Sequence, residues 1–229
     1  GLLAGQDLAK QGATVILADV NVEKVEALAA DIRANGGNAY GVKCDVRKVE
    51  DIENAVAFTR EKGGSVDIMI YTAGGFAGRI FNCPEPFQSR PYEVLDWGID
   101  VNLKGALFFC RAVIGTMIEQ KRGVMIVLGS IDGVTGSAWS VDYSAAKSGM
   151  IGMVKGLAML GAPHNVRACC VSPGPVLTRA AMANMPTPMG RAAEPQEVVD
   201  LILYLASDKA AFISGDNYLI DGARACMVR

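Results

Sequence analysis

A tyrosine and a lysine four residues apart, Tyr143 and Lys147 in the segment DYSAAKSG, are the residues best suited to chemistry. On a helix, positions i and i+4 share one face, so a phenol and an ammonium would lie side by side. One positive charge at ~4 Å, with an effective dielectric constant of ~20, contributes roughly 4 kcal/mol and would lower a tyrosine pKa of about 10 by ~3. The spacing also occurs by chance on surface helices, but it predicts a proton donor and acceptor that works near neutral pH.

The segment just upstream supports a catalytic role for this pair. Residues 124–130, VMIVLGS, form a short continuous apolar run, which predicts a buried parallel strand. The run ends at Ser130, and α/β sheets bind ligands at the carboxyl ends of their strands. A strand, a glycine-containing loop and a helix would bring Ser130 beside Tyr143. We therefore predict a catalytic serine here rather than a simple cap or turn residue.

The composition predicts one globular α/β domain. The chain has 229 residues, 51% of them hydrophobic, and a formal net charge of −2. Its charges are mixed along the chain, which argues against binding to nucleic acid or an anionic membrane. The sequence has no run of about 18 uncharged apolar residues, so no transmembrane helix is predicted. A single histidine, His164, excludes a histidine-based triad or a multi-histidine metal site, so no metal is expected. Six scattered cysteines predict reduced thiols of a cytoplasmic protein.

Strand and helix patterns alternate along the whole sequence. We predict strands at 14–19, 39–46, 66–73, 124–130, 166–173 and 217–222, and helices at 22–34, 50–62, 92–120, 143–160 and 195–207. This alternation is typical of a Rossmann-type doubly wound parallel sheet in a three-layer αβα fold, here a single dinucleotide-binding domain over 1–229. The pattern at 1–13 is helical from the start, whereas such a sheet opens with a strand and a glycine-rich turn. We therefore expect this first strand and most of the turn to be missing from the sequence.

With Ser130, Tyr143 and Lys147 in place, the chain resembles the short-chain dehydrogenases/reductases over its full length. Further segments resemble motifs of that family: Gly1 the last glycine of TGxxxGxG, Asp45-Val46 the DV pair, Thr72-Ala73-Gly74 the NAG segment, Val101-Asn102-Leu103 the VNL segment, and Pro173-Gly174-Pro175-Val176 with Thr178 the PGxVxT loop. The chain departs from the family where Tyr71 and Thr72 replace two asparagines, Cys169 an asparagine and Ala223 a glycine.

The resemblance implies a set of four catalytic residues. Tyr143 is expected to exchange the hydroxyl proton during hydride transfer, Ser130 to donate a hydrogen bond to the substrate oxygen, and Lys147 to hold the nicotinamide ribose. Asn102 is expected to kink its helix and hold a water that links Lys147 to solvent. The alternative interpretation of Asn102 is a buried polar residue that satisfies backbone groups.

The resemblance also implies a nicotinamide cofactor. The expected cofactor-binding residues are Gly1, Asp19, Asp45, Val46, Ala73, Gly74, Asn102, Tyr143, Lys147, Pro173, Gly174, Val176 and Thr178. Asp19 ends the strand 14–19, where a carboxylate accepts hydrogen bonds from the adenosine ribose and repels a 2′-phosphate, which favours NAD over NADP. We predict an NAD-dependent oxidoreductase that interconverts a secondary alcohol and a ketone. The alternatives are an NADPH-dependent 3-oxoacyl thioester reductase and a non-catalytic dinucleotide-binding scaffold.

Two segments are expected to surround a small-molecule alcohol or ketone: 179–189, which is rich in methionine, and 74–97. In the second, Arg79 or Arg90 either holds a substrate carboxylate or is a solvated loop charge. The helices at 92–120 and 143–160 carry more apolar residues than one face needs, which predicts a homo-oligomer. These residues are Leu107, Phe108, Phe109, Met150, Ile151 and Met153. The resemblance makes that oligomer a homotetramer.

Overall fold

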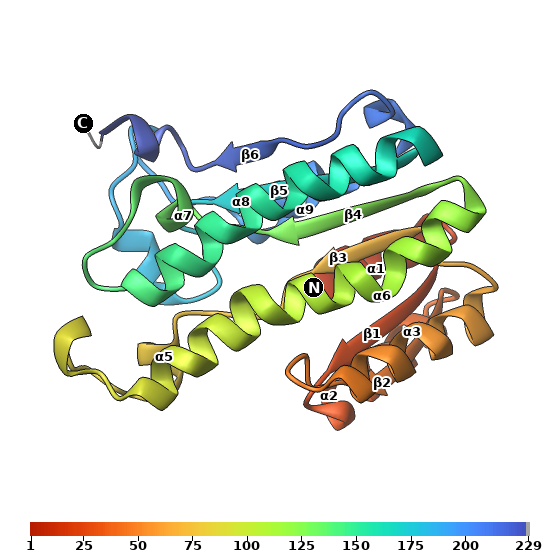
Figure 1. Cartoon of the computed structure of the whole chain (residues 1–229), viewed down its shortest axis with the longest axis horizontal. Helices are drawn as coiled ribbons and strands as arrows, with labels where there is room; N and C mark the ends of the chain where they lie inside the picture. Colours follow the sequence, from red (N-terminus) through yellow and green to blue (C-terminus); the bar gives the residue numbers. More distant parts are fainter. Residues whose placement is uncertain (228–229) are drawn as a thin grey trace.

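The computed structural model describes residues 1–227, in which strands and helices alternate (Figure 1). Its strands are β1 (Thr14–Asp19), β2 (Asn38–Lys43), β3 (Ile68–Tyr71), β4 (Gly123–Leu128), β5 (Val166–Pro173) and β6 (Asn217–Ile220). The longer helices are α1 (Leu2–Lys10), α2 (Val22–Ala34), α3 (Val49–Gly63), α5 (Tyr92–Ile99), α6 (Gly105–Gln120), α8 (Val141–Gly161) and α9 (Pro195–Ala206). The strands and helices predicted from the sequence are all present, so the predicted fold class is confirmed.

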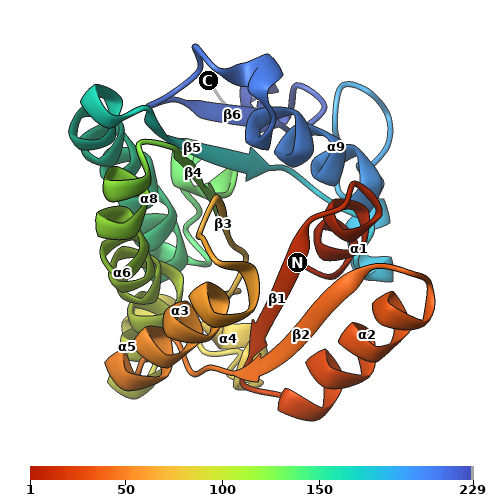
Figure 2. The same cartoon turned by 90° about the vertical axis from the view of Figure 1, so that its right-hand side faces the viewer.

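Helices cover both faces of the parallel strands (Figure 2). On one face, Met117 of α6 and Met150 of α8 are fully buried against Met125 of β4. On the other, Leu205 of α9 packs against Ile126, the next residue of β4. Successive residues of a strand point to opposite faces, so a strand that is buried on both faces has a continuous apolar sequence. Burial on both faces of the sheet therefore explains the continuous apolar sequence VMIVL of β4.

Within residues 1–227 the strands form two sheets, because β1 pairs only with β2 while β3, β4, β5 and β6 pair in that order. β1 and β3 face each other, and among the described residues each presents an edge without a partner strand (Figure 2). The space between them lies where the first strand of a doubly wound sheet is expected. The two sheets are joined through their helices, since α1 packs on α9 and α3 packs on α6.

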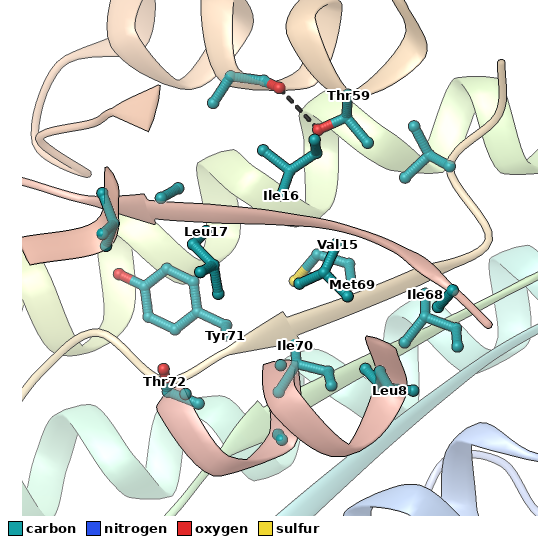
Figure 3. Close-up of a pocket in the computed structure, with 18 of the residues that line it drawn as sticks. Leu8, Val15, Ile16, Leu17, Thr59, Ile68, Met69, Ile70, Tyr71 and Thr72 are labelled. Carbon is teal, nitrogen blue, oxygen red and sulfur yellow. Dashed lines mark hydrogen bonds between the residues drawn. The ribbon is translucent and has the colours of Figure 1, made fainter. Parts of the chain in front are cut away.

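A cavity of about 610 Å³ lies between β1 and β3 (Figure 3). Its walls are mostly apolar and include Val15 and Leu17 of β1, Ile68 and Ile70 of β3, and Leu8 of α1. Unpaired strand edges expose a row of backbone donors and acceptors. The cavity therefore combines an apolar lining with two open strand edges.

The helical stretch Tyr92–Gln120 is long and apolar enough to cross a membrane by length and composition, with a mean hydropathy of 1.4 in its most apolar window. In the fold, 44% of that window is buried, and Cys110, Val113 and Met117 belong to the main core. Core packing therefore accounts for much of its apolar character.

Packing also changes part of the prediction for an oligomer surface. Met150 is fully buried in the core, so it is not available to a partner. Phe108, Phe109, Ile151 and Met153 are partly buried, and each packs against a core cluster. Leu107 is 47% exposed on α6 and remains a candidate interface residue.

Candidate active site

Ser130, Tyr143 and Lys147 come together at the carboxyl end of β4. The strand ends at Leu128, and its carbonyl accepts a hydrogen bond of 2.7 Å from the Lys147 ammonium. This ammonium lies 5.5 Å from the centre of the Tyr143 ring, and the Ser130 side chain is close enough to Tyr143 to lower the pKa of its phenol. The sequence prediction that strand, loop and helix bring these three side chains together is consistent with this geometry.

The protonation of Tyr143 differs from the sequence prediction. Burial is the largest influence and raises the pKa of Tyr143 above 10.0, and the carboxylate of Asp132 raises it further. Hydrogen bonding with Ser130 and the guanidinium groups of Arg79 and Arg179 lower this pKa, but by less. Removal of water from a buried phenol disfavours the phenolate, and here this cost exceeds the effect of nearby charges.

The pKa of Tyr143 is raised overall, so the prediction of a lowered pKa is wrong. The Lys147 ammonium faces the ring of Tyr143 and bonds to the Leu128 carbonyl. The side chain is almost fully buried, and this burial lowers the pKa of Lys147 from 10.5 to about 8. The ammonium is therefore itself held in a weakly solvated site.

Asn102 lies in a π-helical turn, Asp100–Lys104, that separates α5 from α6. Its side chain is fully buried and makes three hydrogen bonds to backbone groups: Oδ1 accepts from the Gly75 amide at 2.9 Å, and Nδ2 donates to the carbonyls of Gly75 and Gly98 at 2.9 and 2.8 Å. The expected irregularity of the helix at Asn102 is present. The side chain also does what the alternative interpretation required, because it satisfies backbone groups of the turn after β3.

Gly74, in the turn after β3, lies between the side chains of Asn102 and Lys147. Gly74 has a φ of 139°, and a Cβ atom there would collide with the side-chain oxygen of Asn102 and lie 3.6 Å from the Lys147 ammonium. Only glycine therefore allows the chain to pass between these two side chains. The turn after β3 is packed directly against the candidate catalytic residues.

Four of the expected cofactor residues, Gly1, Asp19, Val46 and Ala73, line the carboxyl end of the cavity between β1 and β3. The Asp19 side chain is exposed, and its Oδ1 accepts a hydrogen bond of 2.9 Å from the Asn21 amide. Lys43 lies opposite Asp19 in the register of β1 and β2, a basic neighbour that sequence reasoning missed because the two residues are distant in the chain. No ion pair joins them within the described part of the chain.

Asp45 is engaged by its own neighbour rather than free. Its carboxylate forms an ion pair of 2.6 Å with the guanidinium of Arg47, and the resulting hydrogen bonds lower its pKa. The adjacent residue, Val46, faces the cavity. The pair Asp45-Val46 therefore follows the carboxyl end of β2 as expected, and of the two residues it is Val46 that lines the cavity.

The segment Pro173–Thr178 leaves the carboxyl end of β5 as expected. The Gly174 amide donates to the Ile220 carbonyl at 3.0 Å, and a Cβ atom on Gly174 would lie 2.8 Å from the Asp221 backbone. Val176 forms an isolated parallel bridge with Ala193. The cofactor-binding residues expected from four different strand ends thus lie along one edge of the fold, the edge to which the strand arrows point in Figure 1.

The two arginines of 74–97 differ in their surroundings. Arg79 is exposed, within electrostatic range of Tyr143. Arg90 is buried in an ion pair with Asp142, at 3.1 Å. Arg90 is therefore neither a solvated loop charge nor available to a substrate carboxylate, and both sequence interpretations are wrong for it.

Two residues beside the candidate catalytic side chains were not singled out from the sequence. Asp132 acts on the pKa of Tyr143, and its carboxylate accepts a hydrogen bond of 3.1 Å from Ser140. Gly133 is required because a Cβ atom there would lie 2.7 Å from the backbone of Lys147. The glycine-containing loop IDGVTG between strand and helix was the available signal, since a short helix packed this tightly on another needs a glycine at the contact.

The cavity between β1 and β3 does not contain the candidate catalytic side chains. It reaches the expected cofactor residues, but neither Ser130, Tyr143 nor Lys147 lines it. The convergence of polar side chains at the end of β4 is the stronger indication of an active site, because a reaction needs positioned donors and acceptors more than volume. Within residues 1–227, no group of three or more histidine, cysteine or acidic side chains is placed to hold a metal ion.

Comparisons with known proteins identify the family of this chain. A family model described as enoyl-(acyl carrier protein) reductase matches residues 1–223. An uncharacterized oxidoreductase of Mycobacterium bovis is 34% identical over 237 residues, which cover 98% of this chain and 92% of that protein. The L-rhamnose 1-dehydrogenase (NAD(P)(+)) of Azotobacter vinelandii is 31% identical over 240 residues, or 97% of this chain and 91% of that protein.

A solved structure, the crystal structure of gox2181, superposes with a TM-score of 0.90 and 31% identity over 99% of this chain and 91% of that chain. A dinucleotide-binding fold with a serine, tyrosine and lysine at one strand end defines a class of oxidoreductases. The chain belongs to the short-chain dehydrogenase/reductase family. Members of this family use a nicotinamide dinucleotide cofactor.

Proposed function

We propose that this protein is an NAD-dependent oxidoreductase that interconverts a secondary alcohol and a ketone, with Tyr143 as the general acid/base. The observation that carries the proposal is the convergence of Ser130, Tyr143 and Lys147 at the carboxyl end of β4. A phenol, a hydroxyl and an ammonium in one partly buried site can move a proton and stabilise charge on one substrate oxygen.

Each side chain has a distinct part in this reaction. In the oxidation, Tyr143 accepts the proton of the alcohol hydroxyl while Ser130 donates a hydrogen bond to the same oxygen. The bound cofactor supplies the hydride acceptor for oxidation and the hydride donor for reduction. Because burial raises the pKa of Tyr143, the phenol is protonated at neutral pH and is poised to donate its proton to a ketone. Oxidation of an alcohol is therefore expected to accelerate as the pH rises.

Residues at the start of α1 and after β1, β2 and β3 support a dinucleotide site. Asp19 offers an exposed carboxylate to the adenosine ribose, and Gly1, Val46 and Ala73 face the adjoining cavity. Gly74 keeps the backbone close to Lys147, which would hold the nicotinamide ribose. These features support NAD, since a carboxylate at the end of β1 repels a 2′-phosphate.

One observation favours a second candidate, an NADPH-dependent reductase. Lys43 lies opposite Asp19 in the strand register and is exposed, so it is a possible partner for a 2′-phosphate. The relative from Azotobacter vinelandii is named for both NAD and NADP. The carboxylate is nevertheless the residue at the strand end itself, and we assign NAD on that ground.

Steady-state rates with both cofactors test the proposal. The purified protein is assayed with sugars, sugar acids, polyols, steroids and cyclic alcohols or ketones, and kcat/KM is compared for NAD(H) and NADP(H). We expect turnover of at least one secondary alcohol with a preference for NAD. A tenfold or greater preference for NADP(H) would contradict the cofactor assignment, and binding of NAD without any turnover would favour the non-catalytic scaffold.

The proposal includes a cytoplasmic homotetramer. The cysteines are unpaired thiols, which suits a reducing compartment. Leu107 on α6 and Met159 and Leu160 on α8 are exposed apolar side chains on two neighbouring helices, a surface that a second subunit would cover. Light scattering at micromolar concentration should give about four times the 24.1 kDa mass of one chain; a stable monomer would contradict this assembly.

A further inference from the structure

Arg90 and Asp142 form a buried ion pair beside the candidate active site. The Arg90 Nη1 donates to the Asp142 Oδ1 at 3.1 Å, and the two side chains are 0% and 3% exposed. The proposed reaction gives neither residue a part. Burying two charges has a high desolvation cost, so the ion pair alone is weak evidence of a stabilising role.

Arg90 binds more than its carboxylate partner. Its Nη2 donates to the carbonyls of Glu85 and Trp139, at 3.0 and 3.1 Å, and its guanidinium lies 4.9 Å from the centre of the Phe76 ring. Glu85 and Phe76 belong to the segment 74–97, whereas Trp139 belongs to the loop that enters α8. One guanidinium therefore joins two segments that are distant in the sequence.

Asp142 carries this connection to the helix of the catalytic residues. It is the second residue of α8 and directly precedes Tyr143. A Cβ atom on Gly98 would lie 2.7 Å from its Oδ2, so the carboxylate is also packed tightly against α5. Arg90 Nε and Asp142 Oδ2 are buried without hydrogen-bond partners among the described residues. The pair is thus joined by a single hydrogen bond, and its location is better explained by what it connects than by optimal pairing.

We propose that Arg90 is a positioning residue whose ion pair with Asp142 fixes the segment 74–97 against the first turn of α8, so that a substrate bound under this segment is aligned with the Tyr143 hydroxyl. The inference rests on the proposed function of Tyr143. Segment 74–97 exposes Phe81 and Phe87 and lies at the same end of the molecule as the start of α8 (Figure 1). Loss of the tether would leave Tyr143 intact but change the position of the bound substrate relative to it.

The test separates positioning from folding by means of four variants: Arg90→Gln, Arg90→Lys, Asp142→Asn and the double variant Arg90→Gln/Asp142→Asn. A single neutral substitution leaves one buried charge without its partner and should lower the denaturation midpoint, whereas the double variant removes both charges and should recover most of it. Arg122→Gln is the matched control, since it breaks an ion pair of 2.8 Å with Asp67 that is largely exposed and lies at the opposite end of β4.

Three measurements are made on each full-length variant: the denaturation midpoint, amide hydrogen exchange at 76–97 and 139–145, and kcat and KM with NAD and a secondary alcohol found in the screen. The double variant should regain stability yet keep kcat/KM reduced by about 10- to 100-fold, the effect of a misplacement of about 1 Å. Amide exchange should rise in both segments together. Arg90→Lys keeps the charge but loses the planar guanidinium, so its amide exchange and its kcat/KM should lie between those of the wild type and Arg90→Gln. NAD affinity should not change.

Two results would overturn the inference: recovery of kcat/KM in parallel with stability in the double variant, or raised exchange in only one of the two segments. The exchange result decides the matter even if the screen yields no alcohol. If Tyr143→Phe in the otherwise unchanged chain retains more than about a tenth of the wild-type kcat, the proposed function fails, while exchange still reports whether Arg90 joins the two segments.

Discussion

Replacement of Lys147 by methionine tests how the structure holds a charged group beside Tyr143. Methionine is similar in length and apolar, so Lys147→Met removes the charge and leaves the packing nearly unchanged. The lysine is 3% exposed, and burial lowers its pKa from 10.5 to about 8. Between these two values the unfolded chain binds more protons than the folded chain, so the free energy of unfolding of the wild type rises with pH.

The size of this effect follows from the shift. A difference of one pKa unit corresponds to about 1.4 kcal/mol, so the full shift corresponds to about 3 kcal/mol. About 2.5 kcal/mol of this should develop between pH 7 and pH 10, where the folded protein has released the proton and the unfolded chain largely retains it. Lys147→Met lacks this contribution. Below pH 8 the wild type holds a buried charge, and its stability relative to the variant should be lowest there.

The assay is urea unfolding followed by circular dichroism at pH 7, 8.5 and 10, for the wild type and Lys147→Met. Other groups that titrate in this range are common to both proteins and cancel in the difference. Lys155→Met, at an exposed position of the same helix, is the matched control. If the difference between wild type and Lys147→Met changes by less than about 0.5 kcal/mol over this range, Lys147 is not buried as a charged group and the reasoning is wrong.

Three further substitutions test other parts of the site. Asp19→Ala removes the carboxylate at the end of β1 and should raise the ratio of kcat/KM for NADP to that for NAD at least tenfold, measured by steady-state kinetics; an unchanged ratio would exclude Asp19 from cofactor choice. Asn102→Ala removes three buried hydrogen bonds to Gly75 and Gly98 and should lower the free energy of unfolding by about 3 kcal/mol, whereas a loss below about 1 kcal/mol in urea unfolding would contradict this role. Gly133→Ala places a methyl group 2.7 Å from the Lys147 backbone and should cost about 1–3 kcal/mol and reduce kcat; wild-type stability and kcat would show that the contact tolerates a side chain.

Local signals account for the elements that the sequence predicted well. Helix α2 covers residues 22–34 as predicted because Asn21 accepts a hydrogen bond from the Lys24 amide at 3.0 Å and a left-handed glycine, Gly36, follows its end. β1 ends at Asp19 as predicted. The meeting of Ser130 and Tyr143 also follows from local order, because strand, short loop and helix are consecutive in the chain.

Features that depend on distant residues or on burial could not be predicted in this way. Arg90 and Asp142 are 52 residues apart, and nothing near either residue indicates the other. The raised pKa of Tyr143 results mainly from desolvation, which a helical spacing of tyrosine and lysine does not reveal. The π-helical turn at Asp100–Lys104 lies within a segment whose apolar pattern fits one continuous helix.

The most direct test of the proposed function is the turnover of Tyr143→Phe with a secondary alcohol and NAD. This substitution deletes the hydroxyl that is proposed to move the proton and leaves the ring over which the Lys147 ammonium lies. We predict that kcat falls by at least ~10² while NAD affinity is unchanged, as expected for loss of a general acid/base. A variant that keeps more than about a tenth of the wild-type kcat would show that Tyr143 does not carry the proton.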